Sequence, residues 1–167
     1  MTLYMKQAVF SWGDKFTVKD EYGQDRYYVQ GEVFALGKKL HIYNVHGQEV
    51  AFIHQKLLSW MARYNIEIGG RPVCQVVQEL ALLRQKYRVE GLPWRMEGDF
   101  WAHEYELYSP SGPVMRLSKE WFTWGDSYEL DIAEPGDELL CLCVALAVDC
   151  ALAAQQAASN ASTFPGT

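Results

Sequence analysis

The chain has 167 residues, a formal net charge of −6 and an aromatic content of 14%, with ten Tyr and six Trp. This length fits one domain with a sizeable core, and the many aromatic residues favour a β-rich fold. The negative charge opposes the approach of polyanions, so we expect no nucleic-acid partner.

From Met1 to Ile132, apolar and polar residues alternate, which predicts strands with one buried face. Turn residues interrupt the alternation about every 8 to 12 residues, so the segment predicts about twelve short strands joined mostly to their sequence neighbours. Gly69-Gly70 can adopt positive φ at both positions of a two-residue hairpin. Val76 to Leu83 also fits helical spacing, but its strand-like neighbours favour a strand.

A unit consisting of an aromatic anchor, a turn and a strand recurs along the chain. Phe10 to Asp20 is repeated as Phe122 to Ile132, and Leu58 to Ile68 is a looser copy. Gly13-Asp14 and Gly125-Asp126 predict tight turns. We interpret the Trp of each copy as a core residue, and a ligand-stacking role is the alternative.

The longest apolar run lies near the end of the chain. Leu139 to Val148 has no polar side chain, and Pro135 followed by two acidic residues is typical of a helix start. A helix that is apolar on every side must be surrounded, so we predict a helix from about Asp137 to Ala154 in which six residues are strongly buried: Leu139, Leu140, Leu142, Val144, Leu146 and Val148. The sixteen residues from Leu139 to Ala154 would span about 24 Å, less than a hydrocarbon core of about 30 Å. Protein therefore encloses this helix in our interpretation.

Asp149 is the only polar residue in the apolar run. We expect it to be at least partly buried and hydrogen-bonded where the chain leaves the enclosure; a functional acid at that opening is the alternative. Cys141, Cys143 and Cys150 lie in the same helix at spacings that suit buried thiols better than disulfides. With no signal peptide apparent, free thiols predict a cytoplasmic protein.

Residues 158–167 are mostly small and polar, so they predict a flexible tail after a single domain of residues 1–157. Within that domain, a sheet rolled around the helix would cover every side of the helix and leave few free edges. The expected fold is therefore mainly β, an antiparallel barrel of about twelve strands that encloses one hydrophobic C-terminal helix.

Several segments together resemble the LURP-one-related family. They are the paired Phe-Ser/Thr-Trp-Gly-Asp units, Gly31-Glu32, Glu97 to Trp101, and the late Leu-Ala-Val-Asp-Cys run at 146–150. The resemblance extends from about Met5 to Ala154. It implies a twelve-stranded, tubby C-terminal-like barrel threaded by a hydrophobic helix. Among the related folds, tubby domains bind phosphoinositide head groups and scramblases act on bilayer lipids, which implies a lipid-directed role without assigning residues to it.

Motifs for catalysis or metal binding are not apparent in the sequence. The four His residues form no metal-binding pair at helical spacing, and Cys141 and Cys143 lack the gap of a zinc knuckle. We therefore expect no catalytic residue, metal or cofactor.

The strongest candidate for ligand binding is a basic row formed by Arg84, Lys86 and Arg88. Alternate residues of a strand share a face, so these cations would form a row about 13 Å long that suits phosphate oxygens. The alternative is a solvated outer face that hinders strand pairing. Two functions follow: a non-catalytic barrel that binds phospholipid head groups or a membrane surface, or a structural or protein-interaction module.

Overall fold

The computed structural model describes residues 1–6, 15–32, 36–81, 85–122 and 125–161. Its strands are β1 Thr2–Lys6, β2 Lys15–Asp20, β3 Asp25–Gly31, β4 Lys39–Asn44, β5 Glu49–Gln55, β6 Arg63–Ile68, β7 Arg71–Glu79, β8 Lys86–Glu90, β9 Arg95–Asp99, β10 Glu104–Ser109, β11 Gly112–Phe122 and β12 Gly125–Ile132. A short 3₁₀ helix, η1 Pro135–Asp137, leads into helix α1, Glu138–Ala161.

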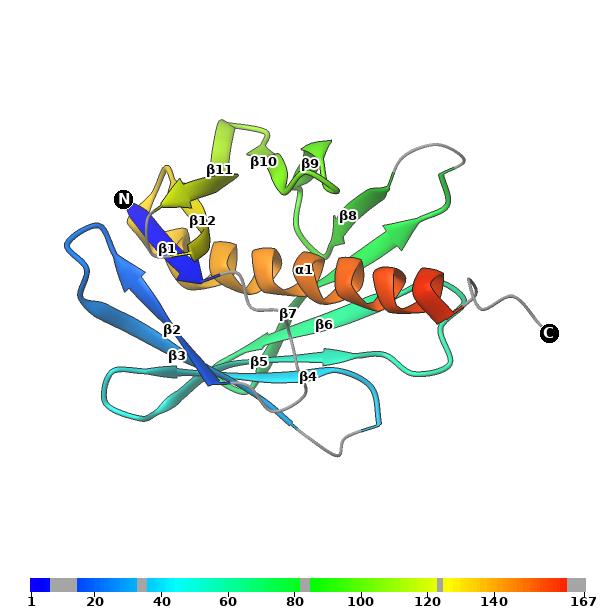
Figure 1. Cartoon of the computed structure of the whole chain (residues 1–167), viewed down its shortest axis with the longest axis horizontal. Helices are drawn as coiled ribbons and strands as arrows, with labels where there is room; N and C mark the ends of the chain where they lie inside the picture. The colour runs from blue at the N-terminus through cyan, green and yellow to red at the C-terminus, as the bar shows by residue number, and fades with distance from the viewer. Residues whose placement is uncertain (7–14, 33–35, 82–84, 123–124, 162–167) are drawn as a thin grey trace.

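The strands form one antiparallel sheet that curls around α1 (Figure 1). Each strand pairs with its sequence neighbour from β1 to β8 and from β9 to β12, and β1 pairs with β12. In the described residues β8 and β9 form no hydrogen-bonded ladder, so the barrel is nearly closed and has a seam between these two strands. This architecture confirms the predicted mainly β barrel with an enclosed C-terminal helix.

Aromatic side chains bridge the seam between β8 and β9. Phe100 stands edge-on to Tyr87 with ring centroids 5.0 Å apart, and its ring centroid also lies 5.0 Å from that of Tyr105. All three residues are buried. Since aromatic pairs at this spacing attract one another beyond their area of burial, they join the two edges where backbone pairing is missing.

The core consists of the inward side chains of the strands and most of α1. In strands such as β4, β6 and β8, alternate residues point to the helix, as the period-two pattern predicts. On the helix, a continuous stretch from Cys141 to Val148 is buried on every side, and Cys150, Ala151 and Leu152 continue it. Of the residues predicted to be strongly buried, Leu142, Val144, Leu146 and Val148 are. Leu139 and Leu140 are only partly buried, because they belong to the first turn of α1 at the end of the barrel.

An ion pair fixes the start of α1 to the barrel wall. Arg26 of β3 donates to both carboxylate oxygens of Glu138, from Nε at 2.8 Å and from Nη2 at 2.9 Å. The Glu138 side chain is 7% exposed, so this two-point contact stabilises a carboxylate that would be unfavourable alone in the core. Glu138 therefore has two effects: its negative charge interacts favourably with the positive end of the helix dipole, and its ion pair with Arg26 fixes the helix to β3.

The helix is longer than the sequence predicts. It continues to Ala161, so residues 158–161, assigned above to a flexible tail, are helical and exposed. Ala and Gln have high helix propensity, and the preceding buried turns provide a nucleus that the last turns extend. The rest of the predicted tail, 162–167, lies outside the described residues.

The predicted turns are partly confirmed. Gly69 and Gly70 both have positive φ, +58° and +73°, and form the two-residue hairpin between β6 and β7. The segment interpreted as a strand, Val76 to Leu83, is only partly one: residues 76–79 lie in β7, residues 80 and 81 do not, and residues 82 and 83 lie outside the described residues. Gly125 and Asp126 do not form a turn: they begin β12 and pair with Phe122 and Trp121. Gly13-Asp14 lies outside the described residues.

The four cysteines provide a test of the enclosure. All four are free and buried, and burial raises the pKa of Cys74 to about 11 and that of Cys141 to about 12. We predict that 5,5′-dithiobis(2-nitrobenzoic acid) at pH 8 modifies none of them in the folded protein and all four in denaturant, because the reagent requires an accessible thiolate. Rapid modification of Cys141, Cys143 or Cys150 in the native protein would contradict the enclosed helix.

Candidate functional site

The candidate site lies at the end of the barrel where α1 finishes, here called the helix-exit end. The connections β3–β4, β5–β6, β7–β8 and β9–β10 all turn at this end because the strands alternate in direction. The last turns of α1 are tied to the same end: Tyr87 donates to Oε1 of Gln155 at 3.3 Å, and Gln155 Nε2 donates to Gln85 at 2.8 Å.

Five large apolar side chains are exposed on three neighbouring connections of the helix-exit end. We call this set the apolar rim: Leu36, Leu57, Leu58, Trp60 and Leu80. The three connections lie close to one another. A Cβ on Gly37 would lie 2.9 Å from Leu57, and Trp60 and Leu80 line the same pocket. Trp101, on the β9–β10 connection at the same end, is also exposed.

Two residues of the apolar rim, Trp60 and Leu58, are unusually exposed for large apolar side chains. Trp60 is 92% exposed, so the interpretation of this Trp as a core residue is wrong. Leu58 is fully exposed and has a φ of +58°, a backbone conformation that branched side chains rarely adopt. A strained and exposed leucine has no role in the core, and such outliers gather at functional sites. The Trp residues of the other two copies, Trp12 and Trp124, lie outside the described residues.

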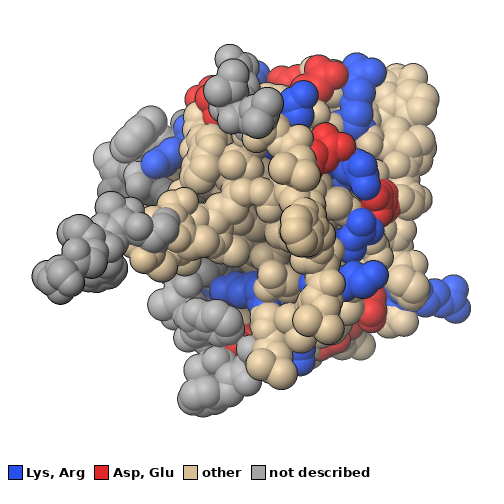
Figure 2. Space-filling view, turned by 90° about the vertical axis from the view of Figure 1, so that its right-hand side faces the viewer, with Lys and Arg blue, Asp and Glu red and all other residues tan. Residues whose placement is uncertain are grey.

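Basic side chains accompany the apolar rim. Figure 2 shows the helix-exit end, where uncharged residues occupy the centre and Lys and Arg lie around them with some Asp and Glu between. Lys56 follows β5, and Lys86 begins β8. Both are exposed, and no carboxylate of the described residues lies within ion-pair distance of either.

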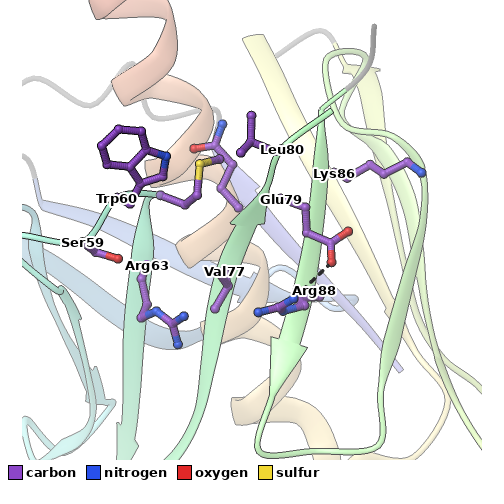
Figure 3. Close-up of a pocket in the computed structure, with 10 residues that line it drawn as sticks. Ser59, Trp60, Arg63, Val77, Glu79, Leu80, Lys86 and Arg88 are labelled. Carbon is purple, nitrogen blue, oxygen red and sulfur yellow. Dashed lines mark ion pairs between the residues drawn. The ribbon is translucent and has the colours of Figure 1, made fainter. Parts of the chain in front are cut away.

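The structure describes two members of the predicted basic row. Lys86 and Arg88 share the outer face of β8, whose side chains alternate between exposed and buried. Arg84 lies outside the described residues. Figure 3 shows Lys86 reaching away from Arg88, so these two cations do not converge on one point.

A pocket of about 510 Å³ lies beside the apolar rim on the outer face of β6, β7 and β8 (Figure 3). Register places Arg63 opposite Val77, and Val77 opposite Arg88, so these three side chains cross the pocket in one row. The other lining residues are Ser59, Trp60, Met61, Gln78, Glu79, Leu80 and Lys86.

Carboxylates compensate the arginines of this pocket. Arg88 contacts Glu79 at 3.5 Å and donates to Glu90, and Arg63 donates to Glu90 and to Gln75. The hydrogen bond from Arg88, followed by that from Arg63, lowers the pKa of Glu90. Local sequence patterns do not predict this arrangement, because it depends on the register of three strands. The alternation of Arg63 and of Glu90 with apolar neighbours was the available signal that both face outward.

The second polar feature is Asp149 on the inner helix. Its side chain is 17% exposed, and its Oδ1 lies 3.7 Å from Nδ1 of His103, too far for a hydrogen bond. Asp149 is thus buried as expected, but His103 lies within ion-pair distance of it without forming a hydrogen bond. Burial raises the pKa of Asp149 to about 7, opposed by the charge of Lys38.

His103 approaches Asp149 from the β9–β10 connection. It has a φ of +56°, and its ring stacks on Tyr128 with centroids 4.7 Å apart. Burial, followed by the charge of Lys119, lowers the pKa of His103. Burial therefore disfavours the charged form of both members of the pair.

The remaining His residues lie on the outer surface. His41 bridges Glu32 at 2.9 Å and Glu49 at 2.8 Å, and His54 lies 3.4 Å from Glu67. In the described part of the chain, no three His, Cys, Asp or Glu side chains are grouped to hold a metal ion.

Comparison with known proteins identifies the family. The family model described as LURP-one-related matches residues 1–149. The chain belongs to the LURP-one-related family. The uncharacterised protein YxjI of Bacillus subtilis (strain 168) is 39% identical over 150 residues, which cover 90% of this chain and 93% of that protein.

A solved structure extends the comparison to the fold of this LURP-one-related protein. The X-ray structure of an Arabidopsis thaliana protein superposes with a TM-score of 0.59 at 17% identity, covering 89% of this chain and 90% of that one. At this identity the similarity concerns the fold alone. Within the described residues, no helix has the length and apolarity to cross a membrane.

Asp149 gives a pH-dependent prediction. Its folded pKa of about 7 exceeds the usual 3.8, so its contribution to stability is present at low pH and is lost as the pH rises to 7. We predict that Asp149→Asn raises the free energy of unfolding relative to wild type by about 2–4 kcal/mol at pH 8 and has little effect at pH 4. Denaturant titrations at both pH values measure this.

His103 contributes with the opposite sign, since its lowered pKa removes stability as the pH falls, and it remains in both proteins. The difference between variant and wild type therefore isolates Asp149. Loss of stability in Asp149→Asn at pH 8 would show that a charged pair with His103 stabilises the fold instead.

Proposed function

We propose that this protein is a non-catalytic barrel that attaches to the surface of membranes containing anionic phospholipid, with its helix-exit end toward the bilayer. The observation that carries the proposal is the apolar rim, in which Trp60 and four leucines are exposed on three adjoining connections. Contiguous exposed apolar residues mark interaction sites, whereas isolated ones are ordinary.

The chemistry of the rim fits a membrane interface. Trp is favoured where an apolar ring meets polar head groups, and leucines on the same loops can enter the acyl boundary. The rim lies on loops that project beyond the strands, so it can enter head groups without unfolding the barrel. The strained backbone of Leu58 is consistent with a side chain held out for contact.

The charges near the rim favour an anionic bilayer over a neutral one. Lys56 and Lys86 are exposed at this end, and each cation near an anionic surface contributes about 1 kcal/mol. The net charge of −6 opposes binding by the rest of the molecule, so attachment would be oriented and sensitive to salt.

The proposal predicts a specific loss of vesicle binding. Replacing Leu58, Trp60 and Leu80 together with Ser should weaken co-sedimentation with phosphatidylserine-containing vesicles at least about 10-fold, because it removes most of the apolar contact area. The measurement is the bound fraction against lipid concentration, at low and high salt, with neutral phosphatidylcholine vesicles for comparison.

The matched control lies at the opposite end of the barrel. Tyr22 and Val45 are also exposed, on the β2–β3 and β4–β5 connections, and replacing both with Ser should leave vesicle binding unchanged. Equal binding by the rim variant and wild type would exclude the rim. Failure of the wild type to bind anionic vesicles would exclude the proposed function and favour a protein-interaction module.

A further inference from the structure

Glu90 holds together two arginines from different strands. One carboxylate oxygen accepts from Nη1 of Arg63 on β6, and the other accepts from Nη2 of Arg88 on β8. The two arginines lie at the same level of the barrel, because both face Val77 on the strand between them. A single carboxylate thus bridges two guanidinium groups across three strands.

The floor between the arginines is covered. Val77 lies on the outer face of the sheet yet is only 4% exposed, because its neighbours in the row shield it. Arg63 is further positioned by Gln75, whose Oε1 accepts from Nη1 at 2.6 Å. Arg88 is further positioned by Glu79 at 3.5 Å. The guanidinium groups are therefore oriented by neighbours other than Glu90.

We propose that Arg63 and Arg88 form a binding site for a phosphate monoester or free phosphate, and that Glu90 occupies this site until the ligand displaces it. Guanidinium groups bind carboxylate and phosphate oxygens through the same paired N–H donors. Two guanidinium groups that a carboxylate bridges can therefore also bind the oxygens of a phosphate. A phosphate dianion carries more charge than the carboxylate it replaces, which favours the exchange.

The surroundings support an anion at this position. Three cations, Arg63, Lys86 and Arg88, line the pocket with one carboxylate, that of Glu79, and Glu90 contacts two of these cations from beside the pocket. Release of Glu90 leaves an excess of positive charge around the space it vacates. Trp60 and Leu80, which belong to the apolar rim, also line this pocket, as Figure 3 shows.

This inference deepens the proposed function and rests on it only for the source of the phosphate. If the rim meets a bilayer, phosphate from a lipid head group would be presented beside Trp60. A soluble phosphate compound would satisfy the same two arginines. The site itself is therefore tested without a membrane.

The test measures the affinity of inorganic phosphate by calorimetric titration of the full chain. Glu90→Gln keeps the size of the side chain and removes the competing charge, and it should bind phosphate about 10-fold or more tightly than wild type. Glu97→Gln is the matched control, because it makes the same change in net charge and frees the single arginine Arg95, with which Glu97 pairs. It should leave phosphate affinity unchanged.

Charge-conserving variants separate a built site from general attraction. In the Glu90→Gln background, Arg63→Lys and Arg88→Lys keep the positive charge but lose the paired donors, so each should reverse the gain. Thermal melts establish that the variants are folded. A Glu90→Gln affinity equal to that of wild type, an equal gain in Glu97→Gln, or no loss in the lysine variants would overturn the proposal.

Vesicles then identify the source of the phosphate. If Glu90→Gln gains affinity for vesicles containing phosphatidic acid, a monoester, over those containing phosphatidylglycerol, a diester, the site takes lipid phosphate. A gain with inorganic phosphate alone supports a soluble ligand. If phosphate binds as predicted while no vesicle does, the proposed function fails and this inference stands.

Discussion

The rest of the structure depends on the need to enclose α1. From Cys141 to Val148 the helix has no face that water could solvate, so it must be covered on all sides. One continuous antiparallel sheet, in which the β1–β12 pair joins the first strand to the last, covers it, and aromatic side chains bridge the remaining seam between β8 and β9. Because the sheet follows the chain from neighbour to neighbour, the same constraint sends alternate connections to the end where the helix leaves.

The two ends of α1 are held in different ways, and this difference positions the candidate site. At the start, the Arg26–Glu138 ion pair joins the helix to β3. At the other end, Gln155 meets Tyr87 and Gln85 through uncharged hydrogen bonds, and exposed apolar side chains surround the exit. The helix-exit end therefore combines an apolar surface, exposed lysines and a pocket with two arginines, while the ion pair holds the opposite end.

Local patterns predicted the fold well because they record local constraints: the apolar run required an enclosed helix, the alternation required strands, and Gly69-Gly70 required a hairpin. The site was less predictable because it depends on contacts distant in sequence. Arg63 and Glu90 are 27 residues apart and meet only through the register of β6, β7 and β8. The repeat suggested that Trp60 is buried, but its exposure depends on the path of the β5–β6 connection.

Amide hydrogen exchange of α1 tests most directly whether the sheet encloses the helix. A helix surrounded by the sheet can expose its amides only when the barrel opens. The amides from Leu142 to Leu152 should therefore exchange with the free energy of global unfolding, as slowly as those of the central strands β4, β5 and β6. Exchange of these helix amides at a markedly lower free energy than the strands would show that α1 leaves the barrel independently, which would contradict this account.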